Sequence, residues 1–423
     1  MAAPTGAGKT VVAEHAIART LGARSGRAFY TTPIKALSNQ KYRDLVARHG
    51  VDSIGLLTGD NAVNGDAPIV VMTTEVLRNM IYAGRELADL EFVVLDEVHY
   101  LQDAYRGPVW EEVIIHLPEH VRLVCLSATV SNTEQLAEWI RTVRGPTDSV
   151  LEQERPVELE HLYLVGDREA GELRMIPPGA AGEPNPDGHG FDRARVLGRR
   201  RGGRPRRRFH TPDRVATTEL LAAAGLLPAI HFIFSRKGCD EAGRAVTSAG
   251  LRLTTDAERR RITAIADEHL AGLGPDDLQA LGHASWRAGL EQGIATHHAG
   301  LVPPFKEAVE QCFVEGLVKV VFATETLALG INMPARSVVV ENLSKFTGET
   351  HELLTPAQYT QLTGRAGRRG IDDHGTAVVL WSPFVSFGQV AGLAASRRFE
   401  LTSSFRPTYN MAANLVRRHD PAE

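Results

Sequence analysis

Short apolar runs alternate with segments of helical spacing along the first 150 residues. The apolar runs are nearly continuous, which is typical of strands buried on both faces of a sheet; they are RAFYTTP, APIVVMTT, EFVVLDE and RLVCLSAT. The intervening segments repeat apolar residues every three or four positions, as one face of a helix requires; they are IKALSNQKYRDLVARHG, TEVLRNMIYAG, GPVWEEVIIHL and NTEQLAEWIRTV. This alternation predicts an α/β domain with a parallel sheet and helices on both faces.

The alternation returns after residue 210 and predicts a second α/β domain. Its apolar runs are PAIHFIFS, VKVVFAT, RSVVVEN and TAVVLWS, and RPVELEHLYLV is predicted to supply its first strand. The sequence thus predicts one domain at residues 1–150 and a second at 151–395. A short tail at 396–423 has the pattern of the beginning of a helical region.

Between residues 166 and 210 the pattern is lost. Glycine and proline dominate residues 171–190, and nine arginines without an acidic residue lie between Arg193 and Arg208. Such a composition buries too little apolar surface to offset the entropy of ordering, so we expect a disordered insertion in the second domain. The chain has a net charge of −4, and this cluster leaves −13 on the remainder. The arginines are either a solvated linker or a local electrostatic contact for nucleic acid.

Several classes of protein are disfavoured by the sequence. No apolar run approaches the length that spans a bilayer, and no basic segment followed by an apolar one opens the chain. The three cysteines lie far apart, without the pairing typical of a metal site. We therefore expect a cytoplasmic protein without a cysteine-bound metal.

Residues 3–10, APTGAGKT, are typical of a phosphate-binding loop. Gly6 and Gly8 allow backbone N–H groups to turn inward around phosphate oxygens. Lys9 can reach the β- and γ-phosphates, and the Thr10 hydroxyl can bind Mg²⁺. The helix that follows offers its N-terminus to the same anion. The alternative is a glycine-rich turn that contains Lys-Thr by chance.

Residues 92–99, FVVLDEVH, form an apolar strand that ends in two adjacent carboxylates. At the carboxyl end of a parallel strand, side chains face the ligand crevice. Asp96 can bind Mg²⁺ through water, and Glu97 can polarise the attacking water. A solvated acidic turn would have the same sequence, but the phosphate loop upstream favours an ATPase.

The segment QLTGRAGRRG, residues 361–370, places Arg365 and Arg368 three positions apart. On a helix these two side chains would share a face. Two guanidinium groups flanked by glycines suit the γ-phosphate of ATP, as arginine fingers. A basic helix that faces solvent or RNA is the alternative.

Ten motifs in order resemble the superfamily 2 helicases of the DExH type, specifically the superkiller-like group, which includes exosome-associated RNA helicases. They are APTGAGKT, TTPIKALSNQKYR, TGD, MTTEVLRNM, DEVHYLQDAYRGPVWEE, LSATVSN, FIFSRKGCD, THHAGLVPPFKE, ATETLALGINMPA and QLTGRAGRRG. They extend over residues 3–370 apart from the insertion. The resemblance implies two tandem RecA-like domains with the ATP site in the cleft between them. It also implies an ATP-dependent RNA helicase that translocates on single-stranded RNA and unwinds duplexes.

The resemblance assigns roles to individual residues. Those implied to bind ATP are Thr5, Gly6, Ala7, Gly8, Lys9, Thr10, Gly330 and Asn332. Those implied to hold Mg²⁺ are Thr10 and Asp96. Those implied to take part in catalysis are Lys9, Asp96, Glu97, Gln361, Arg365 and Arg368. Ser127 and Thr129 would couple hydrolysis to domain motion. Those implied to contact nucleic acid are Pro33, Lys35, Thr73, Thr74, Arg236, His298, Gly300 and Thr324.

The chain departs from the family at both ends. Family members have a helix and a strand upstream of the phosphate loop, and they continue into a winged helix and a helical domain. We therefore expect a truncated chain that binds ATP weakly and unwinds little, with 396–423 as the start of the winged-helix region. Two alternatives stay open: a DNA helicase with the same motor, and a nucleic-acid-binding fragment without ATPase activity. An RNA-degradation machinery is the partner that the resemblance implies.

Overall fold

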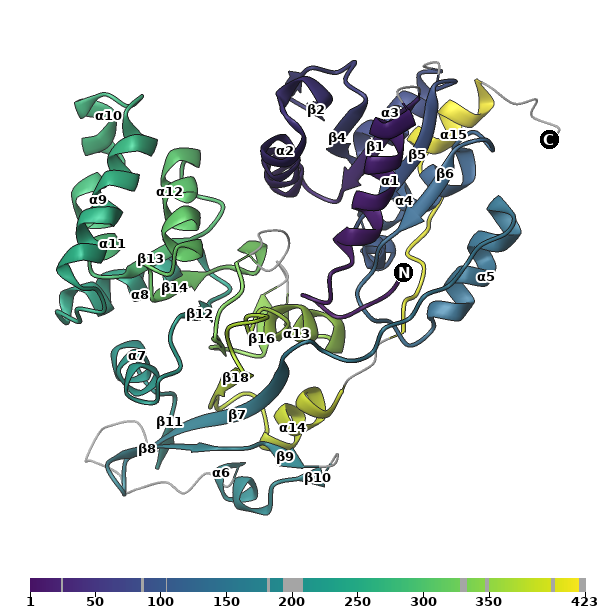
Figure 1. The fold of residues 1–423 in the computed structure, drawn as a ribbon. Coiled ribbons are helices and arrows are strands. Elements are labelled where there is room, and N and C mark those ends of the chain that lie inside the picture. Colours follow the sequence, from purple (N-terminus) through teal and green to yellow (C-terminus); the bar gives the residue numbers. More distant parts are fainter. Residues whose placement is uncertain are drawn as a thin grey trace. The chain divides into compact units, whose positions relative to one another are not determined.

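The computed structural model describes residues 1–23, 26–84, 87–103, 105–180, 183–192, 208–327, 333–346, 350–396 and 400–417. Contacts divide the chain into two compact units. Unit 1 comprises Met1–Arg155 and Arg398–Glu423, and unit 2 comprises Pro156–Arg397 (Figure 1). Each unit has a mostly parallel sheet and its own buried apolar core, as the alternation of strands and helices predicts.

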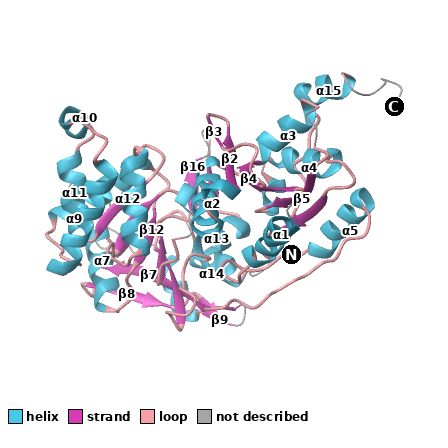
Figure 2. Cartoon of the chain, turned by 45° about the horizontal axis from the view of Figure 1, so that its top comes forward, coloured by secondary structure: helices cyan, strands magenta, loops and turns pink. Residues whose placement is uncertain are grey.

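The sheet of unit 1 has the strand order β3-β2-β4-β1-β5-β6. Its strands, drawn in magenta in Figure 2, are β1 (Arg27–Thr32), β2 (Ile54–Thr58), β3 (Asn61–Val63), β4 (Ile69–Thr73), β5 (Leu90–Leu95) and β6 (Arg122–Cys125). All neighbours run parallel except β2 and β3. The four predicted apolar runs are confirmed as β1, β4, β5 and β6, whereas β2 and β3 were not predicted.

The helices of unit 1 connect these strands. They are α1 (Thr10–Ala23), α2 (Lys35–His49), α3 (Thr74–Tyr82), α4 (Gly107–His116), α5 (Thr133–Arg144) and α15 (Tyr409–Val416), with the 3₁₀ turns η1 (Val51–Ser53) and η2 (Val98–Gln102). The four predicted helical segments are confirmed as α2 to α5. The core between sheet and helices includes Ile17, Tyr30 and Val94, each at most 1% exposed.

Two segments distant in sequence are held on this unit. Ala2 forms parallel bridges with Ser127 and Leu151, so the residues before the phosphate loop join the sheet beyond β6. Later in the chain, the Asn132 side chain donates to Leu401 O and accepts from Leu401 N, both at 2.8 Å. The Ser404 hydroxyl contacts the carbonyls of Leu101 and Asp103 at 2.7 Å. The chain thus returns to unit 1 after completing unit 2.

The main sheet of unit 2 has the order β11-β7-β18-β15-β12-β14-β13, and β8 pairs with β7 outside this path. Its strands are β7 (Glu158–Asp167), β8 (Glu172–Ile176), β11 (Phe209–His210), β12 (Ala229–Phe232), β13 (Ile294–His297), β14 (Val320–Ala323), β15 (Ser337–Val340) and β18 (His374–Leu380). The run RPVELEHLYLV is confirmed as β7. Strands β8, β11 and β13 were not predicted. Two small pairs complete the strands: β9 (Gly179–Ala180) with β10 (Glu183–Pro184), and β16 (Ser344–Phe346) with β17 (His351–Leu353).

In unit 2, helices alternate with the strands along the chain. They are α6 (His189–Asp192), α7 (Arg214–Ala223), α8 (Arg236–Ser248), α9 (Asp256–Leu270), α10 (Pro275–Ala280), α11 (His283–Glu291), α12 (Pro303–Val314), α13 (Pro356–Thr363) and α14 (Phe387–Ala395), with the 3₁₀ turns η3 (Pro186–Gly188) and η4 (Glu325–Leu327). Helices α9, α11 and α12 pack together beside β13 (Figure 1). Among the described residues, no helix combines the length and the apolar character that crossing a bilayer requires.

The expectation of disorder over 166–210 is wrong for the part of this segment that the structure describes. Strand β8 pairs antiparallel with β7 after a turn at Gly171, which has a φ of +71°. Phe191 and Phe209 are buried, with ring centroids 5.0 Å apart, and Phe191 also contacts Tyr163. These aromatic anchors offset the cost of ordering the segment. Residues 193–207, with most of the arginine run, lie outside the described residues.

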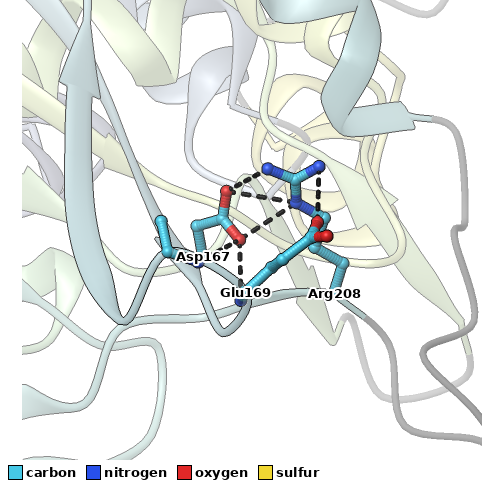
Figure 3. A network of polar contacts seen from close by, with 4 residues as sticks. Asp167, Glu169 and Arg208 are labelled. Carbon is cyan, nitrogen blue, oxygen red and sulfur yellow. Dashed lines mark hydrogen bonds and ion pairs between the residues drawn. The ribbon is translucent and has the colours of Figure 1, made fainter.

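Arg208, the last arginine of that run, is held by an ion-pair network (Figure 3). Its Nε lies 3.0 Å from Asp167 Oδ1 and its Nη2 lies 2.7 Å from Asp167 Oδ2, while Nη1 lies 2.8 Å from Glu169. The hydrogen bonds from Arg208 are the main cause that lowers the pKa of Asp167 to about 2. Arg208 therefore fixes the start of β11 against the end of β7.

Candidate functional site

The predicted phosphate loop lies between Ala3 and the first turn of α1. Gly6 and Gly8 have φ values of +81° and +88°, which other residues rarely adopt, so both glycines are required by the backbone. Val11 N donates to Gly8 O, and Val12 N donates to Lys9 O, so the helix starts within the motif. The loop thus leads directly into a helix N-terminus, where backbone N–H groups favour an anion.

Lys9 contacts the backbone of its own loop. Its Nζ donates to Ala3 O at 2.8 Å and to Pro4 O at 3.1 Å. These contacts hold the ammonium group against the loop that the resemblance assigns to ATP phosphates. A phosphate bound there would compete with the two carbonyls for the ammonium group.

The predicted acidic pair follows β5. Asp96 Oδ2 accepts a 2.7 Å hydrogen bond from the Tyr30 hydroxyl, and Asp96 Oδ1 accepts from Glu97 N at 2.9 Å. Burial, and then the charge of Glu97, raise the pKa of Asp96, although the bond from Tyr30 acts in the opposite direction. Glu97 has a φ of 55°, a left-handed conformation that is uncommon for a residue with a side chain. Such strain is typical of functional positions.

His99 connects the acidic pair to the SAT segment. Its Nδ1 accepts from Ala128 N at 3.3 Å and lies 3.3 Å from Glu97 Oε2. Burial, and next the positive charge of Lys9, lower the pKa of His99 to about 4, so the ring is neutral at pH 7. Because Nδ1 accepts from Ala128, the ring proton belongs on Nε2. Neither Tyr30 nor His99 was predicted as a site residue, although His99 ends the motif DEVH.

The described residues fit Mg²⁺ and ATP. Asp96 is a half-buried carboxylate beside a second carboxylate, and a divalent cation would offset the like charge that contributes to raising its pKa. The Ser127 and Thr129 hydroxyls are buried without a hydrogen-bond partner among the described residues. Within that part of the chain, no cluster of three or more His, Cys, Asp or Glu side chains could hold a metal alone. Other oxygen ligands, such as the Thr10 hydroxyl, water and phosphate oxygens, would complete the coordination of Mg²⁺.

The structure corrects the expectation that Arg365 and Arg368 share a helix face. Helix α13 carries Gln361 but ends at Thr363, and both arginines follow it in a loop. Ala366 bridges to Ala335, and Gly367 adopts a φ of +89°, so the chain leaves the helical path. Arg365 and Arg368 are both half-buried. The other two residues assigned to this part of the site, Gly330 and Asn332, lie outside the described residues.

In unit 1 the candidates for nucleic-acid contact lie at the carboxyl ends of β1 and β4, which are neighbours with Thr32 opposite Thr73. Lys35 is exposed and pairs with Asp60. Pro33 is buried, and its carbonyl accepts from Arg106 at 3.3 Å. Thr74 is fully buried, and its hydroxyl donates to Thr32 O, so its side chain does not lie on the surface in this conformation. Thr74 supports the loop after β1 instead.

In unit 2 the candidates lie at the carboxyl ends of β12, β13 and β14. Arg236 is exposed at the first position of α8, close to Gly300. His298 is 5% exposed, so its side chain does not lie on the surface. Its Nδ1 accepts from Gly300 N at 3.1 Å, and its Nε2 lies 2.9 Å from Asp240. His298 therefore orders the loop at Gly300, while Thr324 lies beside it through a bond to His297 O.

Comparison with known proteins identifies the family. Residues 1–136 match the DEAD/DEAH box helicase family, and residues 279–370 match the helicase conserved C-terminal domain. The chain is 55% identical to the probable helicase HelY of Mycobacterium tuberculosis (strain ATCC 25618 / H37Rv), over 100% of this chain and 48% of that protein. It is 41% identical to the DExH-box ATP-dependent RNA helicase DExH15 chloroplastic of Arabidopsis thaliana, over 98% of this chain and 38% of that protein.

A further relative is the superkiller complex protein 2 of Homo sapiens, which is 41% identical over 99% of this chain and 34% of that protein. The chain thus spans about half or less of the length of these relatives. The two domain matches follow the order of the two α/β units, and the identities extend over nearly the whole chain. The chain belongs to the superkiller-like group of superfamily 2 helicases, which have two tandem RecA-like domains.

Proposed function

We propose that this chain is the motor core of an ATP-dependent RNA helicase. It hydrolyses ATP to move along single-stranded RNA and to open duplexes. The observation that carries the proposal lies in unit 1, which contains both the loop with Lys9 and two left-handed glycines and the half-buried carboxylate of Asp96. The positive charge of Lys9 contributes to the lowered pKa of His99, which lies three residues after Asp96. This effect supports a short distance between the phosphate loop and the acidic pair.

Each group has a role in hydrolysis. Residues Thr5 to Thr10 hold the phosphates, and Thr10 and Asp96 hold Mg²⁺, which supplies charge neutralisation on the phosphate oxygens. Glu97 accepts the proton of the attacking water. His99, neutral at pH 7, packs beside the Glu97 carboxylate and accepts from Ala128 N, so it lies between the acidic pair and the SAT segment. From unit 2, Gln361 positions the water, and Arg365 and Arg368 stabilise the charge on the transferred phosphate.

RNA is bound mainly through its backbone. Lys35 and Arg236 are exposed cations at the carboxyl ends of strands, where they suit phosphate groups. Pro33, Thr73, Gly300 and Thr324 shape the surfaces next to them. Contacts of this kind are independent of base sequence, as a translocating motor requires. The choice of RNA over DNA rests on the relatives, since DExH15 is named as an RNA helicase.

The experiment that tests this function is ATP turnover by the purified chain, with single-stranded RNA, with single-stranded DNA of the same sequence, and without nucleic acid. We expect turnover that RNA stimulates more than DNA and that falls by about 10²–10⁴-fold in Glu97→Gln, because the general base is lost. Stronger stimulation by DNA would replace the RNA assignment. Turnover equal in wild type and Glu97→Gln would reject an active motor.

The proposal extends to location and partners. We place the protein in the cytoplasm, and we expect it to act with an RNA-degradation machinery. The support is the relative in Homo sapiens, whose name makes it part of a superkiller complex. Affinity capture of the tagged protein, followed by mass spectrometry, tests this proposal; recovery without any ribonuclease or RNA-degradation subunit would contradict it.

A further inference from the structure

Arg368 and Asp372 form a two-pronged ion pair within one loop of unit 2. Arg368 Nε donates to Asp372 Oδ2 at 2.8 Å, and Arg368 Nη2 donates to Asp372 Oδ1 at 2.8 Å. The backbone N–H of Arg368 adds a third bond, to Asp372 Oδ2 at 2.9 Å. The Asp372 side chain is 3% exposed, whereas the Arg368 side chain is 22% exposed. The carboxylate is therefore almost fully used by Arg368.

The backbone of this loop is fixed independently of the ion pair. Ala335 N donates to Arg365 O at 2.9 Å, and Gly367 N donates to Ala335 O at 2.8 Å. A side chain at Gly367 would place its Cβ 2.7 Å from Val157 Cγ1, so the loop lies close against the unit. The Arg368 carbonyl accepts from Asp372 N at 2.9 Å and closes the turn. These backbone contacts do not fix the orientation of the long Arg368 side chain.

We propose that Asp372 is a positioning residue that holds the Arg368 guanidinium in the orientation needed for phosphate charge stabilisation. This inference rests on the proposed function, which gives Arg368 its role as an arginine finger. The pair occupies the Nε and Nη2 edge of the guanidinium. Among the described residues, Nη1 has no hydrogen-bond partner, so this edge is available to an anion.

Catalysis is favoured when Asp372 holds the Arg368 side chain in one orientation and does not leave it free to rotate. An unrestrained arginine samples many rotamers, and the ordering would have to occur at each catalytic cycle. Burial acts to raise the pKa of Asp372, but the hydrogen bonds from Arg368 and the charge of Arg336 outweigh it, and the pKa is lowered. The carboxylate therefore stays ionised at neutral pH and keeps both acceptor oxygens for the arginine. The opposite role, a lock that withholds Arg368 from ATP, predicts a change of opposite sign on mutation.

The first test is steady-state ATP turnover with saturating RNA for Asp372→Asn, Asp372→Ala, Arg368→Ala and the double variant. We expect kcat to fall by about tenfold in Asp372→Asn and by up to about a hundredfold in Asp372→Ala, with KM for ATP nearly unchanged, because misplacement affects the transition state most. Asp373→Asn is the matched control, since Asp373 is the exposed neighbour. The double variant should be no slower than Arg368→Ala, because Asp372 acts through Arg368.

The second test needs no nucleotide. In ¹⁵N-labelled protein, the Nε–H signal of Arg368, identified by its loss in Arg368→Lys, should exchange slowly with solvent in the wild type. It should exchange fast in Asp372→Asn, and Asp373→Asn should leave it unchanged. A rise in kcat on mutation of Asp372 would establish a lock and overturn the proposal. Equally fast exchange of the Arg368 Nε–H in wild type and Asp372→Asn would overturn the proposal even if the chain showed no ATP turnover. Absence of turnover would count separately against the proposed function.

Discussion

The Tyr30 hydroxyl donates a 2.7 Å hydrogen bond to Asp96 Oδ2, although 66 residues separate the two in sequence. Tyr30 lies on β1 and Asp96 follows the adjacent strand β5, so their pairing is a consequence of the sheet register. This bond opposes the burial and the Glu97 charge that raise the pKa of Asp96. It therefore keeps the Asp96 carboxyl, which we propose as a Mg²⁺ ligand, closer to its ionised form.

Replacing Tyr30 with phenylalanine should shift the pH dependence of ATP hydrolysis. The hydrogen bond lowers the pKa of Asp96, so its removal raises that pKa, and the acid side of the kcat/KM profile should move to higher pH. Turnover on the alkaline side of the profile should change less than turnover on the acid side. The control is Tyr42→Phe, on the half-buried face of α2. An unshifted acid side in Tyr30→Phe would mean that Asp96 does not limit the rate there.

Replacing Lys9 with alanine should weaken nucleotide binding more than it weakens the fold. The contacts that Lys9 gives up are to the carbonyls of Ala3 and Pro4 in its own loop. Its charge-assisted bonds to phosphate are worth about 2 kcal/mol, so affinity for a fluorescent ATP analogue should fall by about 30-fold. The melting temperature should change little. Lys237→Ala, at an 85% exposed position, serves as control, and equal loss of affinity in both variants would contradict the assignment.

The strands that the sequence predicted carry continuous apolar runs, and several of them, such as β1, β4 and β12, are buried along nearly their whole length. The short strands β2, at Ile54–Thr58, and β13, at Ile294–His297, contain glycine or polar residues and lack that signal. The segment after β7 was predicted to be disordered because its composition is rich in glycine, proline and arginine. Its order depends on Phe191 and Phe209, single aromatic residues whose burial no local periodicity reveals.

At the candidate site, the motifs predicted functional residues but could not predict their contacts. The residue types of the phosphate loop and the acidic pair follow from the chemistry of phosphate and Mg²⁺ binding, so spacing alone was informative. Tyr30 beside Asp96 and His99 beside Ala128 come from different strands and loops, and only the folded chain brings them together. The helix expected at Arg368 was wrong because spacing could not show that Gly367 turns the backbone away.

Replacing Glu341 with glutamine should destabilise unit 2 in a pH-dependent manner. Arg214 binds both Glu341 oxygens at 2.9 and 3.0 Å, and His231 Nε2 lies 3.3 Å away. Burial acts to raise the pKa of Glu341, but these partners outweigh it and lower the pKa from 4.5 to about 2. A carboxyl with a lowered pKa stabilises the fold above its unfolded pKa, and this contribution is lost as pH falls toward the folded value.

The free energy of unfolding should therefore drop by about 2–3 kcal/mol at pH 7 in Glu341→Gln, and the difference from wild type should shrink below pH 4.5. Urea titrations at pH 7, 5 and 3.5 measure this. Glu352→Gln, at an exposed position on β17, should have little effect at any pH. A difference that stays constant from pH 7 to 3.5 would show that packing, and not charge, is lost at Glu341.

Replacing Arg236 with alanine should weaken binding to single-stranded RNA of every sequence to a similar extent. Arg236 is exposed at the start of α8, next to the loop that His298 orders through Gly300 N. If it contacts one phosphate, the slope of log affinity against log salt should fall in magnitude by about 0.7, the value for one contact on a single strand. Fluorescence anisotropy with two unrelated RNA sequences at several salt concentrations measures both effects.

Lys237→Ala provides the matched control, because Lys237 is the next residue, equally cationic, and paired with Glu241. The same slope change in both variants would point to the overall charge of the helix end, and an unchanged slope in Arg236→Ala would remove Arg236 from the RNA-binding surface.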